Sequence, residues 1–134
     1  MPSDWNSKVI DEFRANGGTV ANFGGPLLLL HTTGAKTGRE HVTPVMYRKV
    51  SSGYAVFASF AGQPRNPAWY HNLVAHPDVE AEIGTQTMRL RARVADAAER
   101  EPIWTAHKAE FPGFQDYELK TTREIPVVIL ETVS

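Results

Sequence analysis

Apolar and polar residues alternate along this chain in short segments, and the period of each segment predicts its structure. Apolar positions at helical spacing predict a helix over residues 5–15, which Asn16-Gly17-Gly18 ends. Further helices are expected over residues 67–76, 96–110 and 114–121, where Asp96 is the expected cap of the second. Segments with strand character cover residues 26–32, 41–50, 54–60, 79–83, 87–94 and 125–130.

Prolines and turn residues refine these elements. Pro67 suits the first position of its helix, with Asn66 as the cap. Pro44 lies inside a predicted strand and needs an edge position or a bulge, because it has no N–H to donate. Residues 125–130 are apolar on both faces, which predicts a central strand.

The order of the elements indicates the fold class. Most connections between strands are short enough for antiparallel pairing, and the order is not a regular alternation of strands and helices. We therefore expect a mostly β (α+β) fold, in which an antiparallel sheet closes into a small barrel with peripheral helices. The length of 134 residues suits a single domain over residues 1–134.

Composition and charge narrow the function classes. The chain has 14 basic and 15 acidic residues and a net charge of −1, which argues against nucleic acid as its main partner. It has no cysteine, which excludes disulfides and thiol catalysis. Residues 1–16 show no apolar signal segment, and the longest apolar run is too short to cross a bilayer. We expect a cytoplasmic protein, with little reason for membrane contact.

The densest candidate chemistry lies between Thr32 and Val45, directly after a buried strand. Two glycines, small hydroxyl residues, Lys36, Arg39 and His41 crowd into this stretch. Backbone N–H groups and cations of this kind can hold a phosphate or a carboxylate, although a solvated basic hairpin explains the pattern equally well. The spacing is not that of a Walker loop, and no helix follows, so we expect no helix dipole to assist.

Three further segments have the residues to wall a pocket for a flat ligand. Small residues follow Phe57 at a strand end, where Ser59 can hydrogen-bond a ring atom. Aromatic residues cluster at the helix start within 66–73, and three aromatics recur every third residue within 111–117, as in a lid. A plain hairpin exit, core packing and a hydrophobic seam are the respective alternatives.

The residues supply no other catalytic machinery. The five histidines show neither HxH nor HExxH spacing, and no carboxylate pair is well placed, so we expect no metal site. No GxSxG motif and no nucleophile with an adjacent base is present. Since a cofactor can carry the difficult chemistry, this absence favours a cofactor enzyme.

Four motifs, in order, resemble the deazaflavin (F420)-dependent nitroreductase family. They are the stretch from Thr32 to Pro44, Ala58-Ser59, the stretch from Asn66 to Leu73, and Phe114-Gln115-Asp116-Tyr117 with Ile125-Pro126-Val127-Val128. The match runs from about residue 5 to residue 131. The resemblance implies a split β-barrel of the flavin-reductase, FMN-binding-like type. It also implies an oxidoreductase that passes a hydride from C5 of reduced coenzyme F420 to a quinone, a nitroaromatic or a similar activated acceptor.

The resemblance also implies roles for particular residues. The coenzyme's phosphate and acidic tail would contact Ala35, Lys36, Thr37, His41, Val42, Thr43, Pro44, Val45 and Met46. Its ring would lie against Phe57, Ala58, Ser59, Phe60, Ala68, Trp69, Tyr70, His71 and Asn72. Phe114 would close the pocket, and Ser59 and Tyr117 would act in catalysis by hydrogen-bonding the oxygen of the acceptor.

Four residues depart from the family's usual pattern. His41 stands for an arginine, Phe60 for a lysine, Thr43 for an asparagine and His31 for a threonine. Because these changes weaken the case for tight binding of the coenzyme tail, two alternatives stay open: an FMN-dependent reductase on the same barrel, and a non-catalytic protein that binds F420 or another anionic ligand. The expected partner is a small-molecule hydride acceptor, and a homodimer is compatible with the sequence.

Overall fold

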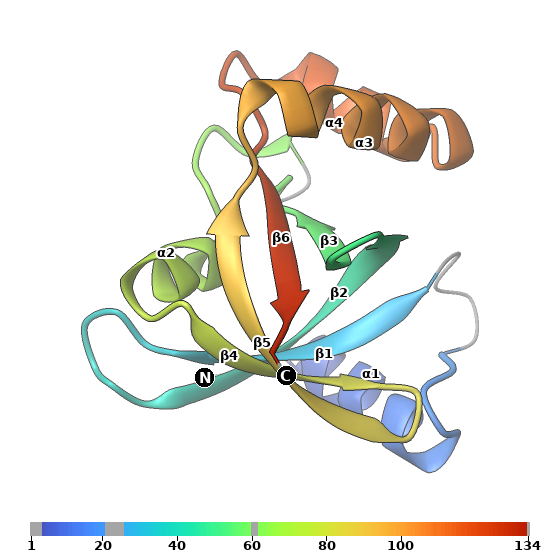
Figure 1. The fold of residues 1–134 in the computed structure, drawn as a ribbon. Helices are drawn as coiled ribbons and strands as arrows, with labels where there is room; N and C mark the ends of the chain where they lie inside the picture. Colours follow the sequence, from blue (N-terminus) through green and yellow to red (C-terminus); the bar gives the residue numbers. More distant parts are fainter. Residues whose placement is uncertain (1–3, 21–25, 60–61, 134) are drawn as a thin grey trace.

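The computed structural model describes residues 4–20, 26–59 and 62–133, which form a closed barrel of antiparallel strands with helices around it (Figure 1). The strands follow each other around the barrel in the order β1-β2-β3-β6-β5-β4. The elements are α1 (Asp4–Ala15), β1 (Leu27–Thr33), β2 (Glu40–Val50), β3 (Gly53–Phe57), α2 (Ala68–Ala75), β4 (Asp78–Ile83), β5 (Gln86–Val94), α3 (Ala97–Glu110), α4 (Gly113–Lys120) and β6 (Val127–Thr132). The predicted fold class, a split β-barrel with peripheral helices, is confirmed.

Strand β1 is apolar on both faces because each face is covered. Leu28 and Leu30 belong to the cluster that fills the barrel interior. Leu27 and Leu29 point to the outside, where they pack against Val9 and Phe13 of α1. Alternate side chains of a strand point to opposite faces, so His31, which is half-buried, follows Leu29 on the outer face.

Helices α3 and α4 cover the outer face of β3 and β6, at the end of the barrel away from α1 (Figure 1). Helix α3 begins as predicted, because the side chain of Asp96 accepts a hydrogen bond of 2.9 Å from the N–H of Glu99. Strand β6 pairs with both β3 and β5, which confirms the prediction of a central strand.

The two halves of strand β2 pair with different neighbouring strands. Its first half, from Glu40 to Met46, pairs with β1, whereas Tyr47 to Val50 pair with β3. Pro44 lies opposite Leu29 of β1, in the half for which no pairing with β3 is described. This place agrees with the predicted edge position, because the proline has no N–H for a second neighbour.

Several predicted boundaries shift by one or two residues, as for the last strand, which was predicted over residues 125–130 and is found over Val127–Thr132. Two further differences, at the end of β3 and at the start of α2, involve one long-range side chain. Strand β3 ends at Phe57 rather than at residue 60, because the carbonyls of Ala58 and Ser59 accept hydrogen bonds from Arg123 instead of from a neighbouring strand. Helix α2 is capped by Pro67 and not by Asn66, since the amide oxygen of Asn66 also accepts from Arg123. Phe60 and Ala61 lie outside the described residues.

Candidate functional site

A cavity of about 360 Å³ lies between the β1–β2 loop and the start of α2. The hairpin of β1 and β2 extends on the same side of the barrel as α2 (Figure 1). The cavity is lined by Gly34, Ala35, Lys36, Thr37, His41, Thr43, Ala68, Trp69, His71 and Asn72. Its volume falls in the range of small-molecule sites.

Asn72 fastens the two walls of this cavity to each other. Its buried side chain accepts a hydrogen bond of 3.0 Å from the N–H of Ala35 and donates one of 3.3 Å to Oγ1 of Thr32. Helix α2 is therefore tied to the end of β1 and to the first residues of the loop. A buried, satisfied amide of this kind sets the geometry of both elements.

The loop from Gly34 to Arg39 is closed tightly by its own backbone. The N–H of Gly34 donates to the carbonyl of Arg39 at 2.7 Å, and the N–H of Gly38 donates to the carbonyl of Gly34 at 2.9 Å. A Cβ atom on Gly34 would lie 2.5 Å from Oγ1 of Thr37, so this position has no room for a side chain. The turn leaves Lys36 exposed beside the cavity.

The cavity is suited to an anion. Lys36 supplies a positive charge, and Ala68 and Trp69 are the first two residues of α2, where the helix dipole is positive. The first turn of α2 has no acidic residue, and none of the ten described lining residues is acidic. The expectation that no helix dipole assists the loop is thus corrected, because the helix comes from later in the chain.

The predicted coenzyme-binding stretch of β2 divides between two faces of the barrel. His41 and Thr43 line the cavity, and Val45, next on the same face, packs against the interior cluster. Val42 points the opposite way, toward α1, as the strand period requires. Of the predicted contacts in β2 and α2, five are not in the lining: Val42, Pro44, Val45, Met46 and Tyr70.

Other predicted residues lie in a separate aromatic cluster beneath α3 and α4. It consists of Phe57, Trp104, His107, Phe114 and Tyr117. The ring centroids of Phe57 and Phe114 are 5.8 Å apart, and those of Phe114 and Tyr117 are 5.5 Å apart. Phe114 therefore packs in a seam between α3, α4 and the barrel, and it does not line the cavity beside Lys36.

His107 is an unusual member of the aromatic cluster. Its ring is fully buried and stacks on Phe57 with centroids 3.8 Å apart. Neither ring nitrogen has a hydrogen-bond partner among the described residues. Burial, and secondarily the positive charge of Arg48, lowers the pKa of His107 to about 4. The imidazole is therefore neutral at ordinary pH.

Arg123 is a positioning residue that the sequence analysis missed. Its guanidinium donates to the carbonyls of Ala58, Ser59 and Gln63 at 3.0–3.1 Å and to Oδ1 of Asn66 at 2.7 Å. Burial lowers the pKa of Arg123. The residue holds the end of β3 against the start of α2, the two segments expected to contact the coenzyme ring. A lone arginine between Thr122 and Glu124 gives no sequence signal for this role.

Ser59 and Tyr117, the predicted catalytic residues, come from segments that pack against each other. The carbonyl of Ser59 accepts a hydrogen bond of 2.9 Å from the N–H of Gly62. A Cβ atom on Gly62 would lie 2.9 Å from the carbonyl oxygen of Tyr117, so this turn packs closely on α4. Ser59 is buried and Tyr117 half-buried.

A closed antiparallel barrel with an anion-suited cavity beside a helix N-terminus defines a cofactor-binding split-barrel protein. More narrowly, the chain belongs to the F420H(2)-dependent quinone reductase family, whose family model matches residues 5–132. Members of this family are oxidoreductases, and the predicted family resemblance is confirmed. No helix in residues 4–20, 26–59 and 62–133 is both long enough and apolar enough to cross a membrane.

Individual relatives agree with this assignment. The chain is 38% identical over 108 residues to an F420H(2)-dependent quinone reductase of Mycobacterium tuberculosis. The aligned region covers 78% of this chain and 72% of that protein. A solved structure described as an F420-H2 dependent reductase superposes with a TM-score of 0.72 at 36% identity, covering 84% of this chain and all of the other. A structure described as a domain-swapped dimer gives a TM-score of 0.73 at 35% identity and covers 98% of this chain and 100% of the other.

Proposed function

We propose that this protein binds coenzyme F420 and transfers a hydride from its reduced form to a quinone, with nitroaromatics and similarly activated compounds as further acceptors. The observation that carries the proposal is the cavity between the β1–β2 loop and α2, which is positive and has no acidic lining residue. Family membership names the coenzyme and the acceptor class.

The residues of the cavity fit the anionic part of this coenzyme. Lys36, the hydroxyl of Thr37 and the N-terminus of α2 would hold its phosphate and acidic tail, because each offers a donor or a positive charge to an anion. His41 and His71 add ring nitrogens on the same lining. The predicted contacts of Val42, Pro44, Val45 and Met46 would then be made through the backbone of β2 rather than through their side chains.

The ring of the coenzyme would lie between the end of β3 and the start of α2. When bound and reduced, the coenzyme supplies a hydride, and the acceptor takes up this hydride and a proton. Arg123 keeps Ala58 and Ser59 fixed relative to α2, which favours a reactive geometry between two bound molecules. Ser59 and Tyr117 would hydrogen-bond the acceptor oxygen as negative charge develops there. The predicted contact of Phe60 lies outside the described residues.

The coenzyme assignment is tested by titrating the protein separately with F420 and FMN and following fluorescence. We expect saturable F420 binding that Lys36→Ala weakens by about tenfold, the loss typical of one charge-assisted contact. Arg39→Ala is the matched control, since it removes an exposed cation from the same loop but not from the cavity lining. Its effect should be much smaller.

Each alternative function gives a different result in this assay. Preferential binding of FMN would replace the proposal with an FMN-dependent reductase. Binding of F420 without turnover of quinones or nitroaromatics would leave a binding protein. An equal loss of F420 affinity in the Lys36 and Arg39 variants would contradict the assignment of the cavity as the coenzyme site. The positive charge of the loop would then favour binding whether or not the charged residue lines the cavity.

The acceptor-binding role of Ser59 and Tyr117 is tested by steady-state kinetics. Tyr117→Phe and Ser59→Ala should each lower kcat by about tenfold to a hundredfold, since a hydrogen bond to the developing oxyanion contributes mainly in the transition state. The affinity for F420 should stay within a factor of two or so of the starting protein. Unchanged turnover in both variants would exclude the role.

We further propose that the protein forms a homodimer and acts in the cytoplasm. Support for the dimer is the similar structure described as a domain-swapped dimer, which covers nearly all of this chain. Light scattering coupled to size-exclusion chromatography distinguishes a dimer from a monomer of 14.9 kDa. Support for the compartment is the cysteine-free composition, and cell fractionation would test it.

A further inference from the structure

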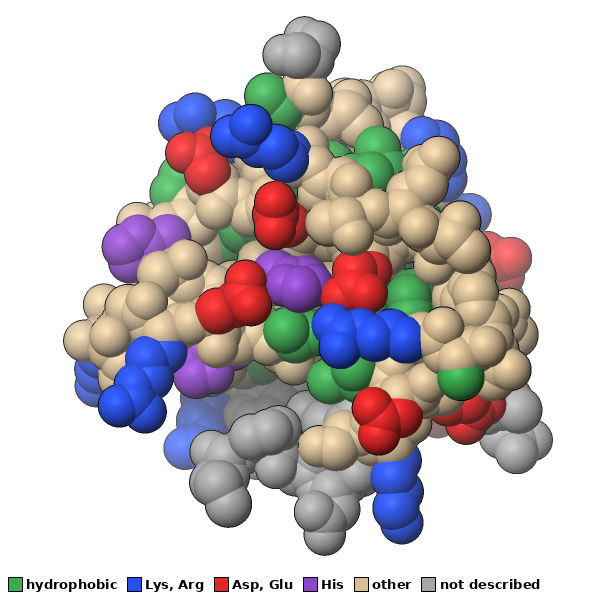
Figure 2. Space-filling model, turned by 90° about the horizontal axis from the view of Figure 1, so that it is seen from below, with side chains coloured by type: hydrophobic (Ala, Val, Ile, Leu, Met, Phe, Trp, Pro, Cys, Tyr) green, Lys and Arg blue, Asp and Glu red, His purple; other side chains and the backbone are tan. Residues whose placement is uncertain are grey.

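A group of charged side chains lies on the outer face of the barrel, beside the end of α1. It consists of His31 on β1, Glu40 at the start of β2, and Glu80 and Glu82 on β4. The strand register brings them together, since His31 is paired with Glu80 and Glu40 lies opposite Thr33. Figure 2 looks onto this face and shows a histidine among acidic side chains with a basic side chain beside them.

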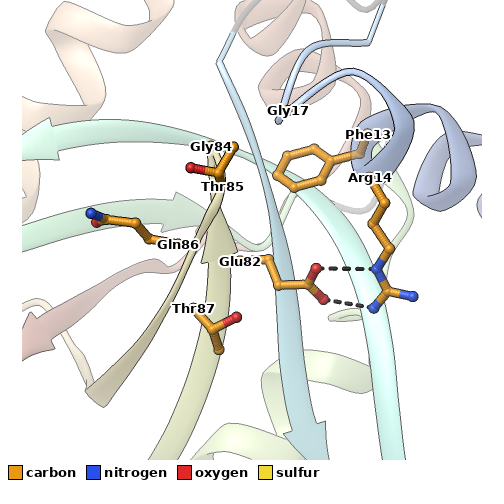
Figure 3. A pocket seen from close by; sticks show the side chains of 8 residues that line it. All are labelled: Phe13, Arg14, Gly17, Glu82, Gly84, Thr85, Gln86 and Thr87. Atoms are coloured by element: carbon orange, nitrogen blue, oxygen red, sulfur yellow. Dashed lines mark hydrogen bonds and ion pairs between the residues drawn. The ribbon is translucent and has the colours of Figure 1, made fainter.

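Hydrogen bonds within the group fix which nitrogen of His31 carries the proton. Nε2 lies 2.7 Å from Oε2 of Glu82, and this carboxylate also accepts two bonds from Arg14, of 3.1 and 2.6 Å (Figure 3). A guanidinium can only donate, so both bonds from Arg14 require the carboxylate of Glu82 to act as the acceptor. Because a carboxylate only accepts, Nε2 is the donor, and a neutral His31 presents a lone pair at Nδ1.

Nδ1 of His31 faces the carboxylate of Glu40. Nδ1 is buried and has no hydrogen-bond partner among the described residues, and it lies 3.4 Å from Oε2 of Glu40. One ligand atom from each of His31, Glu40 and Glu80 falls within 4.8 Å of the others. Two nitrogen or oxygen ligands of a tetrahedral zinc ion lie about 3.4 Å apart, so the side chains of the two exposed glutamates would have to rotate inward to complete a shared coordination sphere.

The charge of the group matches a divalent cation. Glu40, Glu80 and Glu82 carry three negative charges, and Arg14 carries one positive charge, which leaves −2 when His31 is neutral. Asp11 adds further negative charge near Arg14. Bringing these carboxylates together costs electrostatic energy that a bound cation would offset.

We propose that His31, Glu40 and Glu80 bind a divalent transition-metal ion of the zinc type, and that Glu82 orients the imidazole. One nitrogen and two oxygen donors suit zinc and its neighbours better than calcium or magnesium, which take oxygen ligands. The bond from Nε2 to Glu82 is the carboxylate–histidine contact that commonly supports a metal-bound histidine. Three protein ligands leave one position of a tetrahedral ion open to solvent.

This proposal differs from the expectation of no metal site. His31, Glu40 and Glu80 come from three different strands, so no local spacing in the sequence brings them together. The site also lies on a different face from the proposed coenzyme cavity, although Glu40 adjoins His41 at the loop end of the β1–β2 hairpin. Its existence does not depend on the proposed activity.

Calorimetric titration of untagged, chelator-treated protein with ZnCl2 in a non-coordinating buffer tests the site. We expect one zinc per chain at micromolar concentration, and a loss of affinity of tenfold or more in the double variant Glu40→Gln with Glu80→Gln. Both positions are exposed, so the variant should fold normally. The matched control is Glu101→Gln with Glu124→Gln, which removes the same charge from exposed positions elsewhere. This control should bind zinc like the starting protein.

Nitrogen NMR of the histidine rings identifies the ligand atom. Zinc should shift the Nδ1 resonance of His31 while Nε2 stays protonated. Zinc binding that survives in the double variant, a stoichiometry of one zinc for two chains, or shifts confined to other histidines would overturn the proposal. So would a His31 that is protonated on both nitrogens and ignores zinc, since it would then bridge Glu40 and Glu82 as a cation.

Discussion

A half-buried and a fully buried side chain show opposite ways of accommodating polar atoms. Arg123 places its guanidinium among three carbonyls and one amide, so its hydrogen bonds are satisfied and organise the segments around it. His107 is stacked on Phe57 and has no described partner for either nitrogen. An unpaired polar group in an apolar site destabilises the folded state, whereas a paired one gives the local structure its shape.

The burial of His107 predicts a loss of stability in mild acid. The unfolded chain binds a proton near pH 6.5, and the folded chain does so only at about pH 4. The free energy of unfolding therefore falls as the pH drops from about 6.5 to about 4, by as much as ~3 kcal/mol. Replacement of His107 by leucine removes this titrating group. The change in the free energy of unfolding that the substitution causes should therefore be about 2 kcal/mol more favourable at pH 5 than at pH 7.5.

Urea unfolding of the starting protein and His107→Leu at the two pH values checks this prediction. His76→Gln serves as the control, since His76 is exposed at the end of α2 and should leave the pH dependence unchanged. If His107→Leu and the starting protein lose stability in parallel between pH 7.5 and 5, the buried histidine is not the group responsible.

At the level of elements, a few side-chain hydrogen bonds place the helices. Helix α3 begins at the Asp96 cap, and α2 is fastened to β1 through Asn72. The cap of α3 also lies one residue beyond Ala95, whose N–H donates to Val127 of β6 at 2.9 Å. The start of α3 is thus fixed relative to the central strand that it covers.

Loss of the Asp96 cap should destabilise the protein by about 1 kcal/mol, because the N–H of Glu99 would lose its acceptor. Comparison of Asp96→Ala with Asp78→Ala by chemical denaturation isolates the effect. Asp78 is exposed, and the ion pair that it forms with Arg91 is long, at 3.6 Å, and contributes little. Equal destabilisation by both changes would show that the cap is not what fixes α3.

At the scale of the whole molecule, the barrel decides which local features meet. The periodic pattern of apolar residues predicted the strands, their buried faces and the central position of β6. These properties depend on residues that are close together in the sequence. The positions of Phe57, Phe114 and Tyr117 on one outer face, and of Lys36 and α2 around one cavity, depend on which strands are adjacent. Adjacency is not encoded in a local pattern.

The same reason explains the features that the sequence did not predict. Arg123 acts on carbonyls more than 55 residues away in the sequence, so the end of β3 and the cap of α2 were both misplaced. Three strands contribute to the group around His31, and a search for ligands at short spacing cannot find it. About half of the predicted coenzyme contacts line the cavity. They come from the β1–β2 loop, from alternate positions of β2 and from α2.

Pro44 has a consequence for the behaviour of the protein at high concentration. The half of β2 that contains it pairs with β1 and has no described pairing with β3. A free strand edge is a template on which a strand of another molecule can assemble, and this can lead to aggregates. A proline in the middle of such an edge interrupts the ladder of N–H donors that an incoming strand needs. Pro44 thus makes this half of β2 a poor template for an incoming strand.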